Sequence, residues 1–173
     1  MALAAPAAFA GPDFTAHDHA KPEAASTGDS PIAPTDDVTF ALDSDQLTPA
    51  AHEQLRIASK WLARHPEQRL VLEGHTDSLG RKSWNEDLST RRLNSARNQL
   101  IALGVKSDRI VLVVYGEVGA QKAPNLNERR VIFYPSTQAV QQIVSESILN
   151  KHALGAVWTQ GGTLYTQNGK TRA

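Results

Sequence analysis

Two oppositely charged side chains, Asp77 and Arg92, are the residues of this sequence best suited to hold a charged ligand. Asp77 lies in a turn-rich stretch that follows an aliphatic segment, and Arg92 lies on the helix expected next. A carboxylate accepts the N–H groups of an ammonium, and a guanidinium forks onto a carboxylate. The two together would suit a ligand with both groups on one carbon, whereas a mutual salt bridge or plain solvation is the simpler alternative.

The sequence gives little indication of catalysis or of metal binding. His75 beside Asp77 resembles half of an acid–base pair, yet no G-x-S-x-G turn, HExxH motif, phosphate loop or paired-carboxylate context accompanies it. His17 and His19 stand in a polar stretch and are too few for a metal site. We therefore expect no enzyme activity, no cofactor and no metal.

The composition narrows the class of protein. The 173 residues suffice for one domain with tails, and the balance of 18 basic and 18 acidic side chains does not point to nucleic acid or an anionic membrane surface. The absence of cysteine excludes disulfides and a lipid-acceptor thiol in this sequence. No apolar run approaches the roughly 20 residues that span a bilayer, so no transmembrane segment is expected.

The first part of the chain is expected to lie outside the folded domain. Residues 1–10 are apolar and end in Ala-Phe-Ala, which makes them a candidate signal-peptide remnant, although a basic first segment is missing and the run is short. Residues 11–37 are mostly small and polar, so they are interpreted as a disordered linker.

Alternating strand and helix patterns follow in residues 38–135. Residues 38–42, 69–74, 110–115 and 130–134 are typical of strands. Thr48 and Pro49 open a helix that ends at His65-Pro66, and a capping box of Ser83 and Glu86 opens a second helix that ends at Gly104. The order β-α-β-α-β-β predicts an α+β fold, a two-layer α/β sandwich with a mixed sheet.

Residues 136–173 form a C-terminal extension with a pattern of its own. Apolar residues from Val140 to Leu149 have helical spacing, and Gly161-Gly162 between two β-prone runs indicates a hairpin. A helix plus a hairpin is too small to be stable alone, so the extension is expected to pack on the main domain or on a partner.

The stretch around Asp77 resembles the peptidoglycan-binding signature of the OmpA C-terminal family, which includes the peptidoglycan-associated lipoprotein and the flagellar stator anchor. The matching residues are Gly74-His75-Thr76-Asp77, Gly80, Asn85, Leu88-Ser89, Arg91-Arg92, and, in order along the chain, Phe40 to Asp43, Tyr115-Gly116-Glu117 and Arg129-Arg130-Val131. The likeness spans about residues 38–135 and implies an OmpA-like domain there.

The resemblance also implies a ligand, the free end of meso-diaminopimelate in the peptidoglycan stem peptide. Asp77 would take its ammonium and Arg92 its carboxylate. The other residues that match ligand-site positions are Thr76, Asn85, Asp43, Ser44, Leu88 and Arg130. Five of these also have a plainer role: Thr76, Asn85, Asp43 and Ser44 could simply cap or form turns, and Arg130 could be structural.

Three features depart from the family pattern. The connection between Gly116 and Arg129 is shorter than in most relatives, Glu128 replaces the usual Asn, and Trp84 stands where Tyr is common. Arg91 should point about 100° away from Arg92 and is expected to be a surface residue.

The resulting hypothesis is a periplasmic module of a Gram-negative cell envelope that binds diaminopimelate-type peptidoglycan without covalent chemistry. It would be associated with the outer membrane through a partner. The alternative is an interaction subunit of an envelope machine for secretion, conjugation or motility that binds peptidoglycan weakly or not at all. Either version includes a protein partner, reached through the linker or the C-terminal extension.

Overall fold

The computed structural model describes residues 36–121, 125–158 and 163–166. Six strands and three α-helices lie in these ranges. The strands are β1 (Asp36–Thr39), β2 (Arg69–His75), β3 (Ile110–Gly116), β4 (Arg130–Ser136), β5 (Gly155–Trp158) and β6 (Thr163–Thr166). The helices are α1 (Pro49–Arg64), α2 (Lys82–Ala102) and α3 (Val140–Leu149).

Both expected ends of α1 are confirmed. The Thr48 hydroxyl accepts a hydrogen bond from the N–H of Ala51 at 3.1 Å, and Pro49 occupies the first helical position, where it has no N–H to leave unpaired. The helix ends at Arg64, two residues before Pro66, which cannot continue it. Helix α2 ends as predicted before Gly104, whose φ of 90° favours glycine.

Two local predictions are wrong. Helix α2 begins at Lys82 with Arg81 as its N-cap and no side-chain cap, so Ser83 lies inside the helix and forms no capping box. The first strand covers Asp36–Thr39 instead of residues 38–42. Beyond Phe40 the chain curls, because Asp43 adopts a φ of 53° and the carbonyl groups of Ala41 and Ser44 turn toward the side chain of Arg92.

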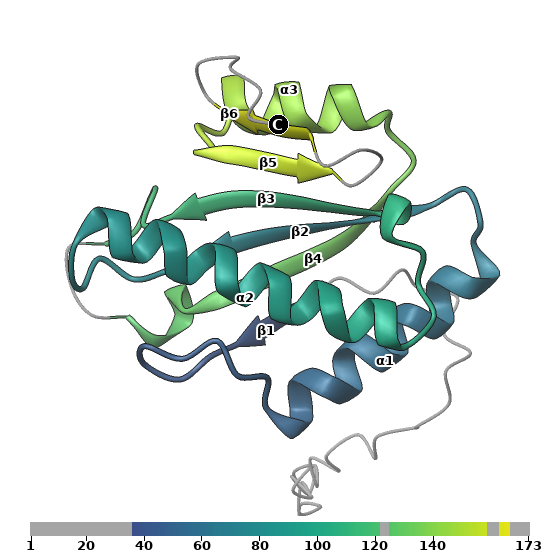
Figure 1. Cartoon of the computed structure of the whole chain (residues 1–173), viewed down its shortest axis with the longest axis horizontal. Helices are drawn as coiled ribbons and strands as arrows, with labels where there is room; N and C mark the ends of the chain where they lie inside the picture. The colour runs from purple at the N-terminus through teal and green to yellow at the C-terminus, as the bar shows by residue number, and fades with distance from the viewer. Residues whose placement is uncertain (1–35, 122–124, 159–162, 167–173) are drawn as a thin grey trace, which may run out of the picture.

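The strands form one mixed sheet in the order β1-β4-β2-β3-β5-β6. Strands β2 and β3 are parallel, and the other neighbours are antiparallel. Figure 1 shows α2 crossing in front of the strands, α1 at the β1 side of the sheet, and α3 beside β5 and β6. The predicted hairpin is confirmed by the pairing of β5 with β6, while Gly161-Gly162 lies outside the described residues.

Each face of the sheet buries its own apolar cluster. Helices α1 and α2 cover Leu70, Leu72 and Phe133 on one face, and α3 covers Val71 and Val113 on the other. Because α3 covers this second face, β3 is buried along its whole length. The structure therefore has the expected α+β sandwich of sheet and two helices, and the extension adds a helix on the opposite face.

Candidate functional site

The turn after β2 brings two polar side chains into the interior. Thr76 and Asp77 follow the last residue of β2 and are almost completely buried. The N–H of Thr76 donates to the carbonyl of Gly116 at 2.7 Å, which ties this turn to the end of β3. The Thr76 hydroxyl has no hydrogen-bond partner among the described residues. An unpaired buried hydroxyl is uncommon and calls for an explanation, such as a ligand that reaches it on binding.

Asp77 pairs with Arg129, which lies immediately before β4. The Arg129 Nε donates to Asp77 Oδ2 at 2.7 Å, and the side chains are only 10% and 6% exposed. Taking two charges out of water is costly, so the pair depends on its close geometry and on further polar contacts. A buried, well-oriented carboxylate is therefore held at the turn after β2.

Arg92 is fully buried on α2. Its guanidinium donates to three backbone carbonyls, those of Ser44 at 2.9 Å, Ala41 at 3.1 Å and His75 at 3.3 Å. Burial lowers the pKa of Arg92 to about 10, while the neighbouring Asp77 carboxylate acts in the opposite direction. The guanidinium thus stays charged at neutral pH, and it also joins the loop before α1 to the end of β2.

Asn85, in the first turn of α2, joins the site to the end of β3. Its side-chain amide donates to the backbone carbonyl of Asp77 at 3.2 Å and to Glu117 Oε2 at 2.7 Å. Leu88 follows on the same helix, is buried, and lies one turn before Arg92. The helix therefore carries three of the predicted site residues toward the turn that holds Asp77.

The loop before α1 supplies two more of the predicted site residues. Ser44 contributes its carbonyl to Arg92, whereas its hydroxyl accepts from the N–H of Gln46. Asp43 is exposed, and its carboxylate accepts a hydrogen bond from the indole N–H of Trp84 at 2.9 Å. Direct contacts thus join Asn85 to Asp77 and Ser44 to Arg92, and Thr76 precedes Asp77 in the same turn.

Similar proteins identify the family of this domain. The family model of the OmpA family matches residues 39–132, more than half of the chain. The chain belongs to the OmpA family. Its domain is therefore a structural binding module and not an enzyme.

Relatives of this OmpA-family chain include two kinds of envelope protein. The peptidoglycan-associated lipoprotein of Brucella melitensis is 32% identical over 91 residues, which cover 53% of this chain and 54% of that protein. Outer membrane porin F of Pseudomonas fluorescens is 33% identical over 81 residues, which cover 47% of this chain and 25% of that protein. The chain thus matches about half or less of the length of these relatives.

Solved structures agree on the fold. The C-terminal domain of Helicobacter pylori MotB superposes with a TM-score of 0.51 at 25% identity, covering 68% of this chain and 97% of that one. The peptidoglycan-associated lipoprotein of Burkholderia pseudomallei gives 0.50 at 24% identity, covering 58% of this chain and 89% of that one.

Within this OmpA-family domain, Arg130 lies apart from the other predicted site residues. It pairs with Asp37 on β1 at 2.9 Å, and its side chain is 35% exposed. Alternation along β4 places it on the face opposite to Val131 and Phe133, which pack under α1 and α2. Arg129 shares the parity of Val131, so the same alternation, applied to the sequence, could have selected Arg129 as the partner of Asp77.

The opposite face of the sheet carries a second polar group. Tyr134 donates to Glu73 at 2.8 Å, and Lys151 lies 3.5 Å from the same carboxylate oxygen. His75 stacks on Tyr115 with ring centroids 4.8 Å apart. Burial lowers the pKa of His75, with Glu73 acting in the opposite direction. Through the pair of Lys151 and Glu73, this group links the segment after α3 to β2. It contains none of the residues proposed for ligand binding.

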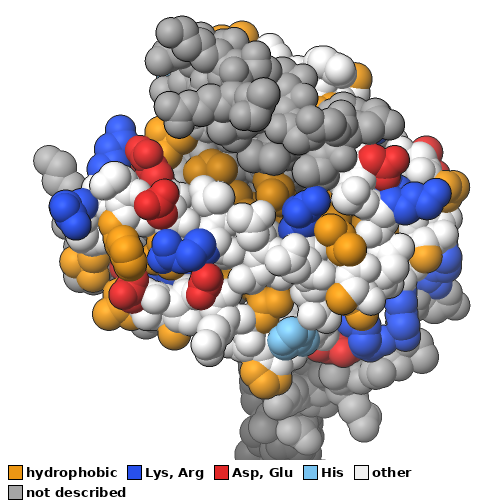
Figure 2. Space-filling model, in the orientation of Figure 1, with side chains coloured by type: hydrophobic (Ala, Val, Ile, Leu, Met, Phe, Trp, Pro, Cys, Tyr) orange, Lys and Arg blue, Asp and Glu red, His pale blue; other side chains and the backbone are white. Residues whose placement is uncertain are grey.

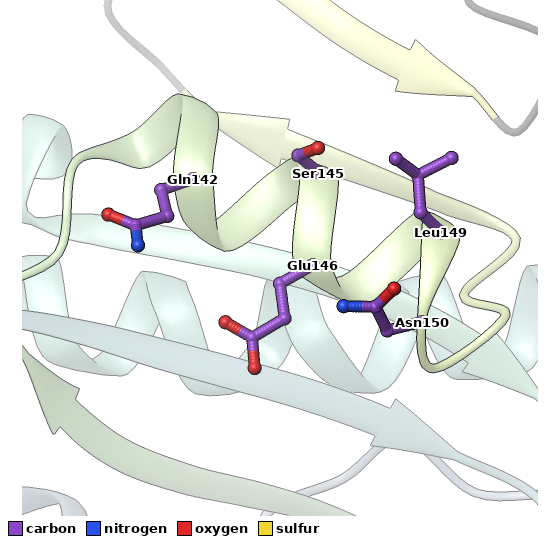
Figure 3. Close-up of a pocket in the computed structure, with 5 residues that line it drawn as sticks. All are labelled: Gln142, Ser145, Glu146, Leu149 and Asn150. Carbon is purple, nitrogen blue, oxygen red and sulfur yellow. The ribbon is translucent and has the colours of Figure 1, made fainter.

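The outer side of α3 carries a shallow depression. Its lining residues are Gln142, Ser145, Glu146, Leu149 and Asn150, and Figure 3 shows them along one side of the helix.

Across residues 36–121, 125–158 and 163–166, none of the helices combines the length and the apolar character that a membrane span needs. The same part of the chain contains no cluster of His, Cys, Asp or Glu side chains suited to a metal ion.

Proposed function

We propose that this domain binds the stem peptide of diaminopimelate-type peptidoglycan non-covalently, and so anchors an envelope protein or complex to the cell wall. The observation that carries the proposal is the buried group of Asp77, Arg92 and Arg129 beside the unpartnered hydroxyl of Thr76. The group lies in the segment that matches the OmpA family. The names of the relatives, peptidoglycan-associated lipoprotein and outer membrane porin, support a periplasmic place of action.

The chemistry follows from the charges. The Asp77 carboxylate would accept N–H groups from the ligand's ammonium, and the two guanidinium groups would donate to its carboxylate. Arg92 uses its Nε and one N–H of each terminal nitrogen on the protein's own carbonyls, so further N–H groups remain for a ligand. Since these charges are already buried and oriented, little side-chain ordering would be needed on binding.

Residues with indirect roles complete the proposed site. Asn85 would hold the Asp77 turn, and Ser44 would orient Arg92 through its carbonyl. Leu88 would form an apolar wall, and Asp43 would belong to the rim. Arg130 would act only through the strand that also positions Arg129, because its own side chain pairs with Asp37.

Calorimetry with matched stem peptides tests the specificity. The peptide with diaminopimelate at the third position should bind at least about tenfold more tightly than the lysine form, because lysine lacks the carboxylate that the buried guanidinium groups would pair with. Equal affinities would mean that neither Arg92 nor Arg129 reads this carboxylate.

A pull-down with purified sacculi tests the anchoring role. The full chain should be retained, and Asp77→Asn should reduce retention, because the substitution removes the charge that attracts the ammonium. Asp87→Asn, on an exposed position of α2, is the matched control and should bind as the unchanged protein does. Retention of Asp77→Asn equal to that of the control would refute the site.

A second candidate function is docking to a partner protein through the extension. Leu149 favours it, because this apolar side chain on the outer side of α3 is 69% exposed. A photocrosslinking residue at position 149, used in cells, should capture an envelope protein. If the chain also failed to bind sacculi, this interaction role would replace the anchoring role.

A further inference from the structure

The indole of Trp84 is exposed but firmly held. Its side chain stands at the start of α2 with 45% exposure. Its N–H donates to Asp43 at 2.9 Å, and the Arg91 guanidinium lies 4.9 Å from the ring centre. Arg91 in turn is 3.6 Å from Asp45. Two groups therefore fix the orientation of the ring: Asp43 binds its N–H edge, and Arg91 lies over one of its faces.

Within residues 37–121, 125 and 127–156, Trp84 is the aromatic member of the exposed large hydrophobic side chains, and the others are aliphatic: Leu42, Ile57, Leu79, Ile101, Leu103 and Leu149. Figure 2 shows hydrophobic, acidic and basic side chains close together over the start of α2 and the loop before α1. A rigid indole with polar neighbours suits a ligand that has both apolar and hydroxyl-bearing surfaces.

Trp84 is also connected to the proposed peptide site. It precedes Asn85, which holds the Asp77 turn, and its partner Asp43 precedes Ser44, whose carbonyl binds Arg92. On α2, Trp84 is two turns before Arg92, with Leu88 between them. At a rise of ~1.5 Å per residue, the two lie ~12 Å apart along the helix axis.

We propose that Trp84 is a platform for a sugar ring of the glycan strand, a subsite separate from the peptide site and resting on the proposed peptidoglycan function. The apolar C–H face of a pyranose would stack on the indole, and Asp43, Asp45 and Arg91 would offer hydrogen-bond partners to hydroxyl and N-acetyl groups. An extended peptide of three residues spans roughly 10–11 Å. If the third residue of the stem peptide is bound at Arg92, the sugar attached to the first residue would therefore lie close to Trp84.

Calorimetry with two probes separates the subsites: a free stem peptide, and the same peptide carrying its disaccharide. The unchanged protein should bind the disaccharide form about three- to tenfold more tightly, the range expected for one stacking contact. Trp84→Ala should abolish this difference, so that the two probes bind this variant equally well. Trp84→Tyr should keep part of it, because a ring remains.

Controls keep the two proposals distinguishable. Ile57→Ala removes another exposed hydrophobic side chain, on α1, and should leave both affinities unchanged. Equal binding of the two probes by the unchanged protein, or an equal loss for both probes in Trp84→Ala with a normal melting curve, would overturn the sugar platform. Failure of both probes to bind the unchanged protein would instead refute the peptidoglycan function itself.

Discussion

At the scale of residues, the two neighbouring arginines at the start of β4 have different environments. Arg129 forms a buried ion pair with Asp77, and Arg130 forms a partly exposed pair with Asp37. Breaking a buried pair leaves one charge uncompensated in the interior, whereas an exposed pair contributes little.

Arg129→Ala should therefore cost ~3–5 kcal/mol of unfolding free energy, and Arg130→Ala no more than ~1 kcal/mol. Urea denaturation of the two variants measures this difference directly. Sacculus binding should follow the same order, because only Arg129 orients Asp77. Equal costs for the two substitutions would show that burial does not distinguish these arginines.

His75 should make stability depend on pH. Burial lowers its pKa in the folded protein, whereas an unfolded histidine titrates near ~6.5. Above that pH both states are neutral, so His75 makes no difference. As the pH drops below this value, the unfolded state binds the proton first. The stability of the folded state therefore decreases with decreasing pH, until the pKa of the folded protein is reached.

The comparison variant is His75→Phe, which keeps a ring to stack on Tyr115. Melting temperatures between pH 7.5 and 5.5 should fall further in the unchanged protein than in this variant. Parallel curves for the two proteins would show that His75 does not titrate differently on folding.

At the scale of elements, Gly74 sets how closely α2 lies against β2. A Cβ built on Gly74 would stand 2.7 Å from Leu93 Cγ and 2.8 Å from Ser89 Oγ, closer than real Cβ atoms approach such neighbours. The Ser89 hydroxyl also donates to the Gly74 carbonyl at 2.9 Å. The helix that carries Asn85 and Arg92 is thus placed by a residue without a side chain.

Gly74→Ala should cost ~1–3 kcal/mol, because the added methyl group overpacks the interface. A double-mutant cycle with Leu93→Ala measures the clash: the double variant should lose less stability than the sum of the single losses. Additive losses would mean that the methyl group is accommodated without displacing Leu93.

At the scale of the whole molecule, the extension is part of the folded domain. Strand β5 pairs with β3, and α3 buries Val71, Val111 and Val113, each with no exposed surface. Uncovering a large apolar side chain costs ~1.5–3 kcal/mol, so these three alone represent ~5–9 kcal/mol, comparable with the whole stability of many domains.

Deletion of everything after Ser136 should therefore give a protein that unfolds or aggregates, as circular dichroism and light scattering would reveal. A milder pair of variants tests the same point in a folded protein. Ile143→Ala, on the inner side of α3, should cost ~2–5 kcal/mol, and Leu149→Ala, on its outer side, about 0.5 kcal/mol or less. A cooperative, fully stable truncated domain would contradict this assignment.

Much of this protein is encoded locally in its sequence. The Thr48-Pro49 start of α1, the end of α2 before Gly104 and the apolar run of β3 follow from capping groups, backbone preferences and periodicity within a few residues. The motif around Asp77 and Arg92 likewise indicated the family and the two elements that carry these residues, because its spacing reflects one turn and one helix.

Tertiary structure decided the contacts between distant segments. Asp77 lies 52 residues before Arg129, and Arg92 lies 51 residues after Ala41, so these contacts depend on strand register and on how the loop before α1 curls. A one-residue difference in strand position exchanges the two faces of the sheet, which is why Arg129 rather than Arg130 meets Asp77. The position of α3 was open for the same reason: its apolar stripe predicts burial, but only the packed sheet determines which face it covers.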